Sequence, residues 1–183
     1  MSKQIEDSEI LSLFSNEKTK EKAFELLMKK YKTDIYYATR RVVTSHEDAN
    51  DVTQNVLLKI WRYLNTFRGE SSLRTWILRI CMNESLNFIA QRKKLLNLYD
   101  DDYATYTLKT AAEERHVSSD KIESLLREAI ARLPDKQRTV FTLRYFNETP
   151  YEELSKILDT SVGALKASYH FAVKKVEEFL SKH

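Results

Sequence analysis

The sequence predicts an all-α protein made of two small helical domains joined by a flexible acidic linker. Three observations support this prediction. Only two glycines and two prolines occur among 183 residues, so long segments without turn residues are expected. Apolar residues recur three or four positions apart through most of the chain, which is the period of an α-helix. That pattern stops between residues 95 and 120 and then resumes.

The distribution of charge agrees with this division into domains. We expect an N-terminal domain over residues 1–94, the linker over residues 95–120 and a C-terminal domain over residues 121–183. The N-terminal domain carries 17 Lys or Arg against 12 Asp or Glu, and the C-terminal domain carries 11 against 9. The linker carries 2 against 6. Two mildly basic domains therefore flank an acidic connector, which is expected to be at most partly helical.

The N-terminal domain is expected to contain three helices. The first is predicted over residues 21–43, where apolar side chains share one face. Ser45 stands three residues before Asp48, as in a capping box, and predicts a second helix that ends near Leu64.

Residues 65–72 contain a glycine and several hydroxyl residues, so they are expected to form a loop. Ser71 or Ser72 can cap the third helix, which is predicted to run from Leu73 to Lys94. Its aromatic residues, Trp76 and Phe88, are expected in the core.

The C-terminal domain begins with a helix that ends at Leu133, because the following proline disfavours helix in the residue before it. A short second helix is expected to reach about Tyr145. Thr149 then stands as a capping residue, with Pro150 in the first helical position and Glu152 in the third.

Asp159 to Ser161 break that third helix, and Ser161 can cap a fourth one from Val162. Two helices joined by about three residues form a helix-turn-helix, whose second helix enters the major groove in DNA-binding proteins. The residues that would reach DNA from it are Ser161, Gly163, Lys166, Ala167, His170, Lys174 and Lys175. On charge alone, an ordinary helical hairpin with a solvated lysine face explains the pattern equally well.

A second polar stripe lies on the predicted helix from Leu73 to Lys94. Its amide and guanidinium groups suit base edges or phosphates, although the same spacing is typical of a solvated face. The stripe comprises Arg74, Arg79, Asn83, Asn87, Gln91 and Lys94.

The sequence contains no motif that indicates an enzyme, a metal site or a cofactor. It has no glycine-rich phosphate loop and no HExxH or CxxC spacing, and its four histidines lie far apart. Cys81 is the only cysteine, which fits a reducing compartment. No apolar run approaches the roughly 20 residues of a membrane span, so we expect a cytoplasmic protein without a small-molecule substrate.

Four stretches resemble segments of the sigma-70 family of RNA polymerase sigma factors, in the extracytoplasmic-function (ECF) group. Residues 48–61 (DANDVTQNVLLKIW) are similar to DAEDLTQEVFLRVW, and residues 67–80 (FRGESSLRTWILRI) to FRGESSFRTWLYRI. Residues 133–141 (LPDKQRTVF) are similar to LPxxQRxVF. Residues 151–158 followed by 161–166 are similar to the helix-turn-helix YEEIAEILxxSVGTVK. The stretches occur in the family's order and spacing.

The resemblance implies that the chain binds core RNA polymerase, through its clamp coiled coil and flap, and directs initiation at specific promoters. The residues that would bind the clamp are Asp48, Asp51, Gln54, Asn55, Leu58 and Trp61. Those expected at the minus-ten element are Asn65, Thr66, Arg68, Ser71, Arg74, Arg79, Asn83 and Asn87, and the helix-turn-helix would read the minus-thirty-five element. A membrane-bound anti-sigma factor is an expected partner, and the free protein is expected to be a monomer.

Several positions depart from the family's pattern. Met82, Asn83 and Asn87 stand where Arg, Asn and Asp are frequent, and Asp159 replaces the usual glycine of the turn. The promoter sequence is therefore not predicted. The acidic residues Asp100 to Asp102 are hypothesised to mimic RNA in the polymerase channel, with a solvated spacer as the alternative. Two other functions are also considered: a free-standing helix-turn-helix regulator, which would usually be dimeric, and a structural helical adaptor.

Overall fold

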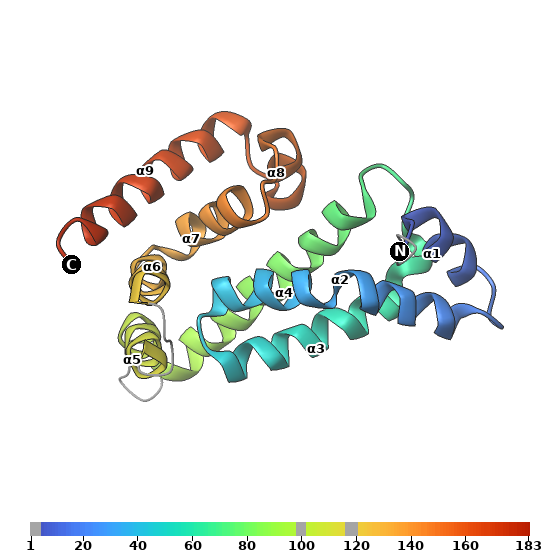
Figure 1. Ribbon diagram of the computed structural model, residues 1–183, viewed down its shortest axis with the longest axis horizontal. Coiled ribbons are helices and arrows are strands. Elements are labelled where there is room, and N and C mark those ends of the chain that lie inside the picture. Colours follow the sequence, from blue (N-terminus) through green and yellow to red (C-terminus); the bar gives the residue numbers. More distant parts are fainter. Residues whose placement is uncertain (1–4, 98–101, 116–120) are drawn as a thin grey trace.

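The computed structural model describes residues 5–97, 102–115 and 121–183, and these residues form helices without any strand. The N-terminal domain contains four α-helices and a 3₁₀ turn: α1 (Asp7–Phe14), α2 (Lys20–Val43), α3 (His46–Tyr63), η1 (Leu64–Thr66) and α4 (Leu73–Asn97). The all-α prediction is confirmed. Helices α2, α3 and α4 pack on one another as a three-helix bundle, and α1 covers one end (Figure 1).

The serine caps of this bundle occur where the sequence predicts them. The Ser45 side chain accepts a hydrogen bond from the Asp48 backbone N–H at 3.3 Å, which starts α3. The Ser72 Oγ accepts one from the Thr75 N–H at 3.1 Å, which selects Ser72 over Ser71 as the cap of α4. Each cap satisfies one of the backbone N–H groups that the first turn of a helix leaves without a partner.

Helix α1 is absent from the sequence prediction. It contributes Ile10 and Phe14, which are 0 % and 3 % exposed, to the same core as α2 and α4. With eight residues it is shorter than an isolated helix needs to be stable in water, so its packing on α2 stabilises it.

Within the segment expected as a linker, the structure forms helix α5 (Tyr103–Arg115). Tyr103 is 5 % exposed and joins the large apolar cluster to which residues of both domains contribute, and the Tyr106 hydroxyl donates to Asp48 Oδ2 at 3.0 Å. The Arg92 guanidinium donates to Asp48 Oδ1 at 3.2 Å and to the Tyr106 oxygen at 3.0 Å. The first half of this helix is therefore docked on the N-terminal domain.

Replacing Tyr106 by Phe is expected to lower the free energy of unfolding by about 1.5 kcal/mol, because the buried Asp48 carboxylate loses a donor. Urea unfolding followed by circular dichroism measures this change. Tyr63→Phe is the matched control, since the Tyr63 side chain is 45 % exposed. Equal stability of the two variants would show that the hydroxyl does not hold α5 in place.

The C-terminal domain contains α6 (Lys121–Ala131), α7 (Asp135–Phe141), the π-helical turn η2 (Thr142–Phe146), α8 (Tyr151–Leu158) and α9 (Val162–Leu180). Helices α8 and α9 form the predicted helix-turn-helix. Asp159 ends α8 with a left-handed backbone (φ 48°), which Asp tolerates better than most residues. The Ser161 side chain accepts a hydrogen bond from Ala164 N–H at 3.4 Å and caps α9.

The predicted capping box at the start of α8 is wrong by one residue. The N-cap is Pro150, with extended backbone and no side-chain cap. Thr149 is 1 % exposed and faces inward, and its backbone closes the turn after η2: its N–H donates to Leu143 O, and its carbonyl accepts from Arg144. Tertiary packing of Thr149 therefore overrides its local capping propensity.

The two domains pack against each other. Helices α6 to α9 lie along one side of the α2–α4 bundle, with α5 at its end (Figure 1). Leu154, Ile157 and Leu165 of the helix-turn-helix belong to the same apolar cluster as Leu73 and Ile77 of α4. A second, smaller core around Phe141 and Ala172 lies within the C-terminal domain itself.

Candidate polymerase and nucleic-acid interfaces

Helix α3 presents an exposed stripe made of Asp51, Gln54, Asn55 and Leu58, which we call the α3 stripe. The residues are spaced three or four apart because the opposite face of the helix, with Val52, Val56 and Ile60, is buried in the bundle. Leu58 is 63 % exposed and is the one apolar side chain among these four residues. An apolar centre with a polar rim is typical of a protein-binding surface.

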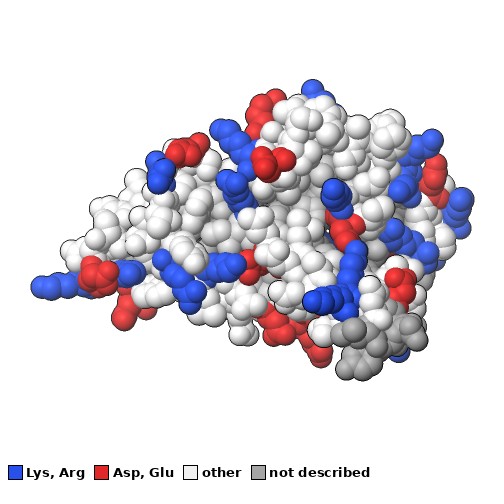
Figure 2. All heavy atoms as spheres, turned by 180° about the vertical axis from the view of Figure 1, so that it is seen from behind, with Lys and Arg blue, Asp and Glu red and all other residues white. Residues whose placement is uncertain are grey.

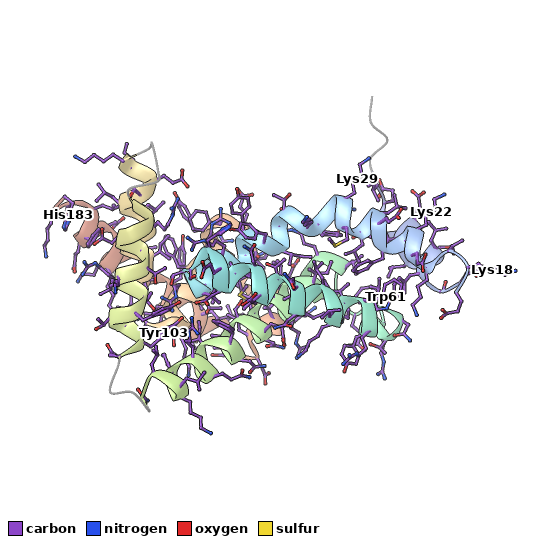
Figure 3. All side chains as sticks on the ribbon, turned by 90° about the horizontal axis from the view of Figure 1, so that it is seen from below. Lys18, Lys22, Lys29, Trp61, Tyr103 and His183 are labelled. Atoms are coloured by element: carbon purple, nitrogen blue, oxygen red, sulfur yellow. The ribbon has the colours of Figure 1, made fainter. Side chains whose placement is uncertain are left out.

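The other two residues expected at the polymerase, Asp48 and Trp61, point into the protein. Asp48 is 5 % exposed and accepts hydrogen bonds from Arg92 and Tyr106. The Trp61 ring packs edge-on against Phe14 and Phe24, with centroids 5.6 Å and 5.2 Å apart. Trp61 lies near the α1 end of the bundle and Tyr103 at the opposite end (Figure 3). These two residues therefore support the α3 stripe and lie outside it.

The loop between α3 and α4 and the first turns of α4 line a cleft. The wall formed by the N-terminal domain contains the Phe67 and Trp76 rings. It also contains four residues that were expected at the minus-ten element: Thr66, Arg68, Ser71 and Arg79. Asn65 is exposed next to them. Gly69 adopts a positive φ of 74°, so the loop needs a glycine there. Lys156, Ile157 and Asp159 at the end of α8 form the other wall.

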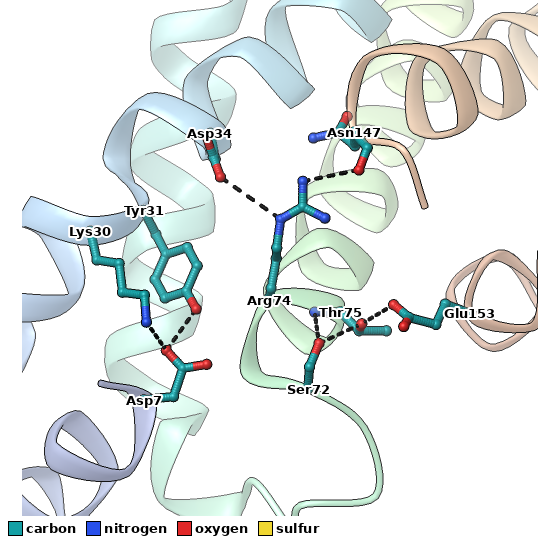
Figure 4. Close-up of polar contacts among 9 residues, drawn as sticks. All are labelled: Asp7, Lys30, Tyr31, Asp34, Ser72, Arg74, Thr75, Asn147 and Glu153. Atoms are coloured by element: carbon teal, nitrogen blue, oxygen red, sulfur yellow. Dashed lines mark hydrogen bonds and ion pairs between the residues drawn. The ribbon is translucent and has the colours of Figure 1, made fainter. Parts of the chain in front are cut away.

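Arg79, Asn83 and Asn87 form an exposed stripe along α4, and Arg74 is turned away from it. The Arg74 Nη2 donates to the Asn147 carbonyl oxygen at 3.1 Å, and its Nε lies 3.9 Å from Asp34 Oδ2 (Figure 4). Of the residues expected at the minus-ten element, Arg79 lines the cleft and begins the exposed row that continues to Asn83 and Asn87 on α4. Arg74 lies outside both, held by Asn147 and Asp34.

The expected DNA-reading face of α9 is exposed at Ser161, Gly163, Lys166, Ala167, His170 and Lys174. Lys175 is exposed too, but its Nζ donates to Gln137 Oε1 of α7 at 3.0 Å, which aims it away from that face. A Cβ on Gly163 would meet nothing within 4 Å. The protein itself therefore does not require glycine at this position.

Charge is mixed on the face shown in Figure 2, where Lys and Arg side chains occur beside Asp and Glu side chains. This face therefore does not carry a uniform field of one sign.

The described residues contain no cluster of three or more His, Cys, Asp or Glu that could hold a metal ion. Cys81 is fully buried, and burial raises the pKa of its thiol far above the usual range, so it is not a reactive thiolate. None of the described helices is long and apolar enough to cross a membrane.

Solved structures of low sequence identity share this fold. The sigma factor RpoE in complex with the anti-sigma factor NepR from Bartonella quintana superposes with a TM-score of 0.71 at 19 % identity, covering 87 % of this chain and 98 % of that one. CnrH in complex with the cytosolic domain of CnrY gives a TM-score of 0.66 at 19 % identity, covering 96 % and 94 %.

The sequence comparisons agree with the fold. An ECF RNA polymerase sigma-E factor of Haemophilus influenzae is 31 % identical over 85 % of this chain and 86 % of its own length. RNA polymerase sigma-H factor of Pseudomonas aeruginosa is 29 % identical over 87 % and 86 %, respectively. Residues 27–95 match Sigma-70 region 2, and residues 123–176 match Sigma-70 region 4. This chain therefore belongs to the sigma-70 family, as an ECF-type sigma factor that directs RNA polymerase to promoters.

Proposed function

We propose that this sigma factor divides promoter recognition and polymerase binding among three separate surfaces. The α3 stripe binds the clamp coiled coil of the polymerase, the loop and the polar stripe of α4 capture the minus-ten element, and α9 reads the minus-thirty-five duplex. The observation that carries the proposal is the exposure of all three sets of side chains on one folded chain. In this proposal the protein is a non-catalytic subunit, and the polymerase supplies the chemistry of transcription.

Capture of a base explains how such a protein promotes melting without an enzyme activity. A base that leaves the duplex costs a few kcal/mol of stacking and pairing. The cleft beside Arg68 and Arg79 offers aromatic rings and cationic donors that can hold an unstacked base and its phosphate. Binding the open strand offsets part of the melting cost, so opening becomes favourable only where the sequence fits.

Permanganate probing of promoter DNA tests this proposal. Thymines near minus ten are expected to become reactive only when both core polymerase and this protein are present. Reactivity with the protein alone, or none with both, would contradict the proposed division of roles.

In one of the two similar solved structures, the sigma factor RpoE is bound to the anti-sigma factor NepR, and in the other CnrH is bound to the cytosolic domain of CnrY. By analogy, we propose that an anti-sigma factor, anchored in the membrane, also controls this chain. An anti-sigma factor that binds to the α3 stripe or between the domains would prevent this protein from taking part in transcription initiation. Capture of such a partner from the membrane fraction of the source cell, competed by core polymerase, tests this part.

Replacing Gly163 by Ala should stabilise the protein slightly but weaken promoter binding. Alanine is favoured over glycine in a helix by up to about 1 kcal/mol, and the new Cβ meets open space. On DNA, the same methyl group would meet the backbone that approaches the start of α9, so we expect roughly tenfold weaker minus-thirty-five binding. Thermal unfolding and gel-shift titration measure the two effects. Ala164→Gly is the reciprocal control, because Ala164 is exposed on α9 and lies outside the proposed DNA-reading residues. Unchanged DNA affinity in Gly163→Ala would move the DNA contact away from this turn.

A further inference from the structure

Helix α9 exposes a large apolar side chain, Phe171. Its side chain is 55 % exposed, whereas Leu165, Ala172 and Val176 of the same helix are buried. The Phe171 ring lies edge-on to the neighbouring His170 ring, with centroids 5.8 Å apart. A phenyl ring left in water gains free energy when a partner covers it, so Phe171 is a candidate contact residue.

The ring lies on the outer side of the C-terminal domain. Helix α7 lies between α9 and the α2–α4 bundle, so the outer face of α9 is turned away from the bundle (Figure 1). The proposed DNA-reading residues Lys166, His170 and Lys174 are exposed on that face. Phe171 is therefore accessible to the same partner as these residues.

The helical period places Phe171 at the edge of the DNA-reading face. Residues three or four apart are neighbours on a helix surface, so Phe171 lies between Ala167 and Lys174. Long side chains in a helix lean toward its N-terminus, so the ring covers the turn that contains Ala167. This direction brings the phenyl ring toward the start of α9, the part of a recognition helix that reaches base edges.

The chemistry of the major groove indicates what the ring contacts. The apolar group that base pairs present there is the C5 methyl group of thymine, and the other groups are hydrogen-bond donors and acceptors, which a phenyl ring cannot satisfy. Phosphates suit the flanking Lys166 and Lys174 instead, because these side chains carry the opposite charge. Ala167 and Phe171 thus form an apolar pair whose complement on duplex DNA is a thymine methyl group.

We propose that Phe171 selects thymine at one position of the minus-thirty-five element, by packing its ring, together with the Ala167 methyl group, against the C5 methyl group of that base. Cytosine is rejected there, because it lacks the methyl group and presents an amino donor that the ring leaves without an acceptor. Phe171 is then a specificity-determining residue in addition to the polar and small residues of α9 expected from the sequence. This inference rests on the proposed reading of the minus-thirty-five duplex by α9.

Deoxyuridine tests the contact, because it differs from thymidine only by the absence of the C5 methyl group. Holoenzyme made from core polymerase and this protein is titrated with duplexes that carry the minus-thirty-five element of a responsive promoter. Each thymine of the element, on either strand, is replaced in turn. One replacement should lower the affinity of wild type roughly fourfold, which corresponds to about 0.8 kcal/mol for one buried methyl group.

Phe171→Ala completes a double-mutant cycle with that replacement. The variant should bind the thymine duplex roughly tenfold more weakly than wild type, because more of the ring than the methyl contact is lost. It should bind the thymine and deoxyuridine duplexes equally, and Phe171→Leu should keep most of the preference for thymine. Ile122→Ala is the matched control, since Ile122 is 76 % exposed on α6 of the same domain and lies outside the DNA-reading residues.

Salt dependence distinguishes a base contact from a phosphate contact. Phe171→Ala should leave the slope of log affinity against log salt concentration unchanged, because a phenyl ring releases no counterion from DNA. Lys174→Ala should make that slope shallower by about 0.9, the value for one phosphate contact. A shallower slope in Phe171→Ala would contradict base reading by the ring.

Equal deoxyuridine effects in wild type and in folded Phe171→Ala overturn the inference, and so does the absence of any deoxyuridine effect in wild type. Weaker binding of Phe171→Ala to core polymerase without DNA also overturns it, because the ring would then contact the polymerase. The proposed function fails in a different way. In that case wild-type protein and core polymerase together neither bind nor open any promoter fragment.

Discussion

Leu58→Glu is expected to lower the affinity for core polymerase by roughly 30-fold. Leu58 is the apolar centre of the α3 stripe, and the central apolar anchor of an interface typically contributes about 2 kcal/mol or more. A carboxylate there would be desolvated without a partner on complex formation. Because the side chain is 63 % exposed, the fold itself should tolerate the change. Competition binding against wild-type protein measures the affinity.

Leu95→Glu is the matched control, since Leu95 is 52 % exposed and lies near the end of α4, outside the α3 stripe. Equal polymerase affinity of the two variants would remove the α3 stripe as the binding surface. Trp61→Ala is a less specific test of polymerase binding than the family resemblance suggests. Loss of the Trp61 packing against Phe14 and Phe24 would disturb α1 and α2 whether or not the residue contacts polymerase.

Replacing Asn83 and Asn87 together by Ala is expected to lower promoter-specific transcription by about 100-fold, because each amide that pairs with a base edge contributes roughly 1–3 kcal/mol. Both side chains are exposed on α4, so the free energy of unfolding should change little. Transcription from a panel of promoters with single-base changes near minus ten measures the effect.

The same promoter panel distinguishes a loss of base recognition by Asn83 and Asn87 from a general loss of transcription. Each single Asn→Ala variant should lose its preference at one promoter position and keep its preference at the others. A uniform loss over all positions, with polymerase affinity unchanged, would contradict base reading by these amides.

Much of the fold follows from local patterns in the sequence. The period of Leu27, Tyr31 and Ile35 correctly predicts α2, and the serines at 45, 72 and 161 mark helix starts because capping depends on residues only three positions apart. Helix α1 escapes prediction because its eight residues make only about two turns, which is too short for a repeating period to be recognised. Its stability comes from tertiary contacts, which are not local.

The segment that was expected to be a linker shows the same limit of prediction from local sequence patterns. Residues 103–115 have no sustained apolar stripe, yet they form α5, because Tyr103 enters the core and Tyr106 bonds to Asp48. The first contact depends on packing, and the second joins residues 58 positions apart. Asp100 and Asp101, which carry part of the RNA-mimicry hypothesis, lie outside the described residues, and Asp102 alone of that run is described.

The candidate surfaces were predicted in part. The resemblance names Gln54, Asn55 and Leu58 together, and the structure places them on one exposed face of α3, as the helical period explains. The burial of Asp48 depends on its hydrogen bonds with Arg92 and Tyr106, and no sequence motif identifies those partners. Likewise, the contact between Thr75 and Glu153 joins residues 78 positions apart and became visible only in the folded chain.

Run-off transcription with purified core polymerase and a panel of genomic promoter fragments tests the central claim most directly. The account predicts discrete transcripts from a subset of fragments only when core polymerase and this protein are both present. Those fragments would also supply the promoter sequence that the other experiments use. If no fragment responds while the folded protein binds duplex DNA alone as a dimer, the role as a sigma factor is contradicted.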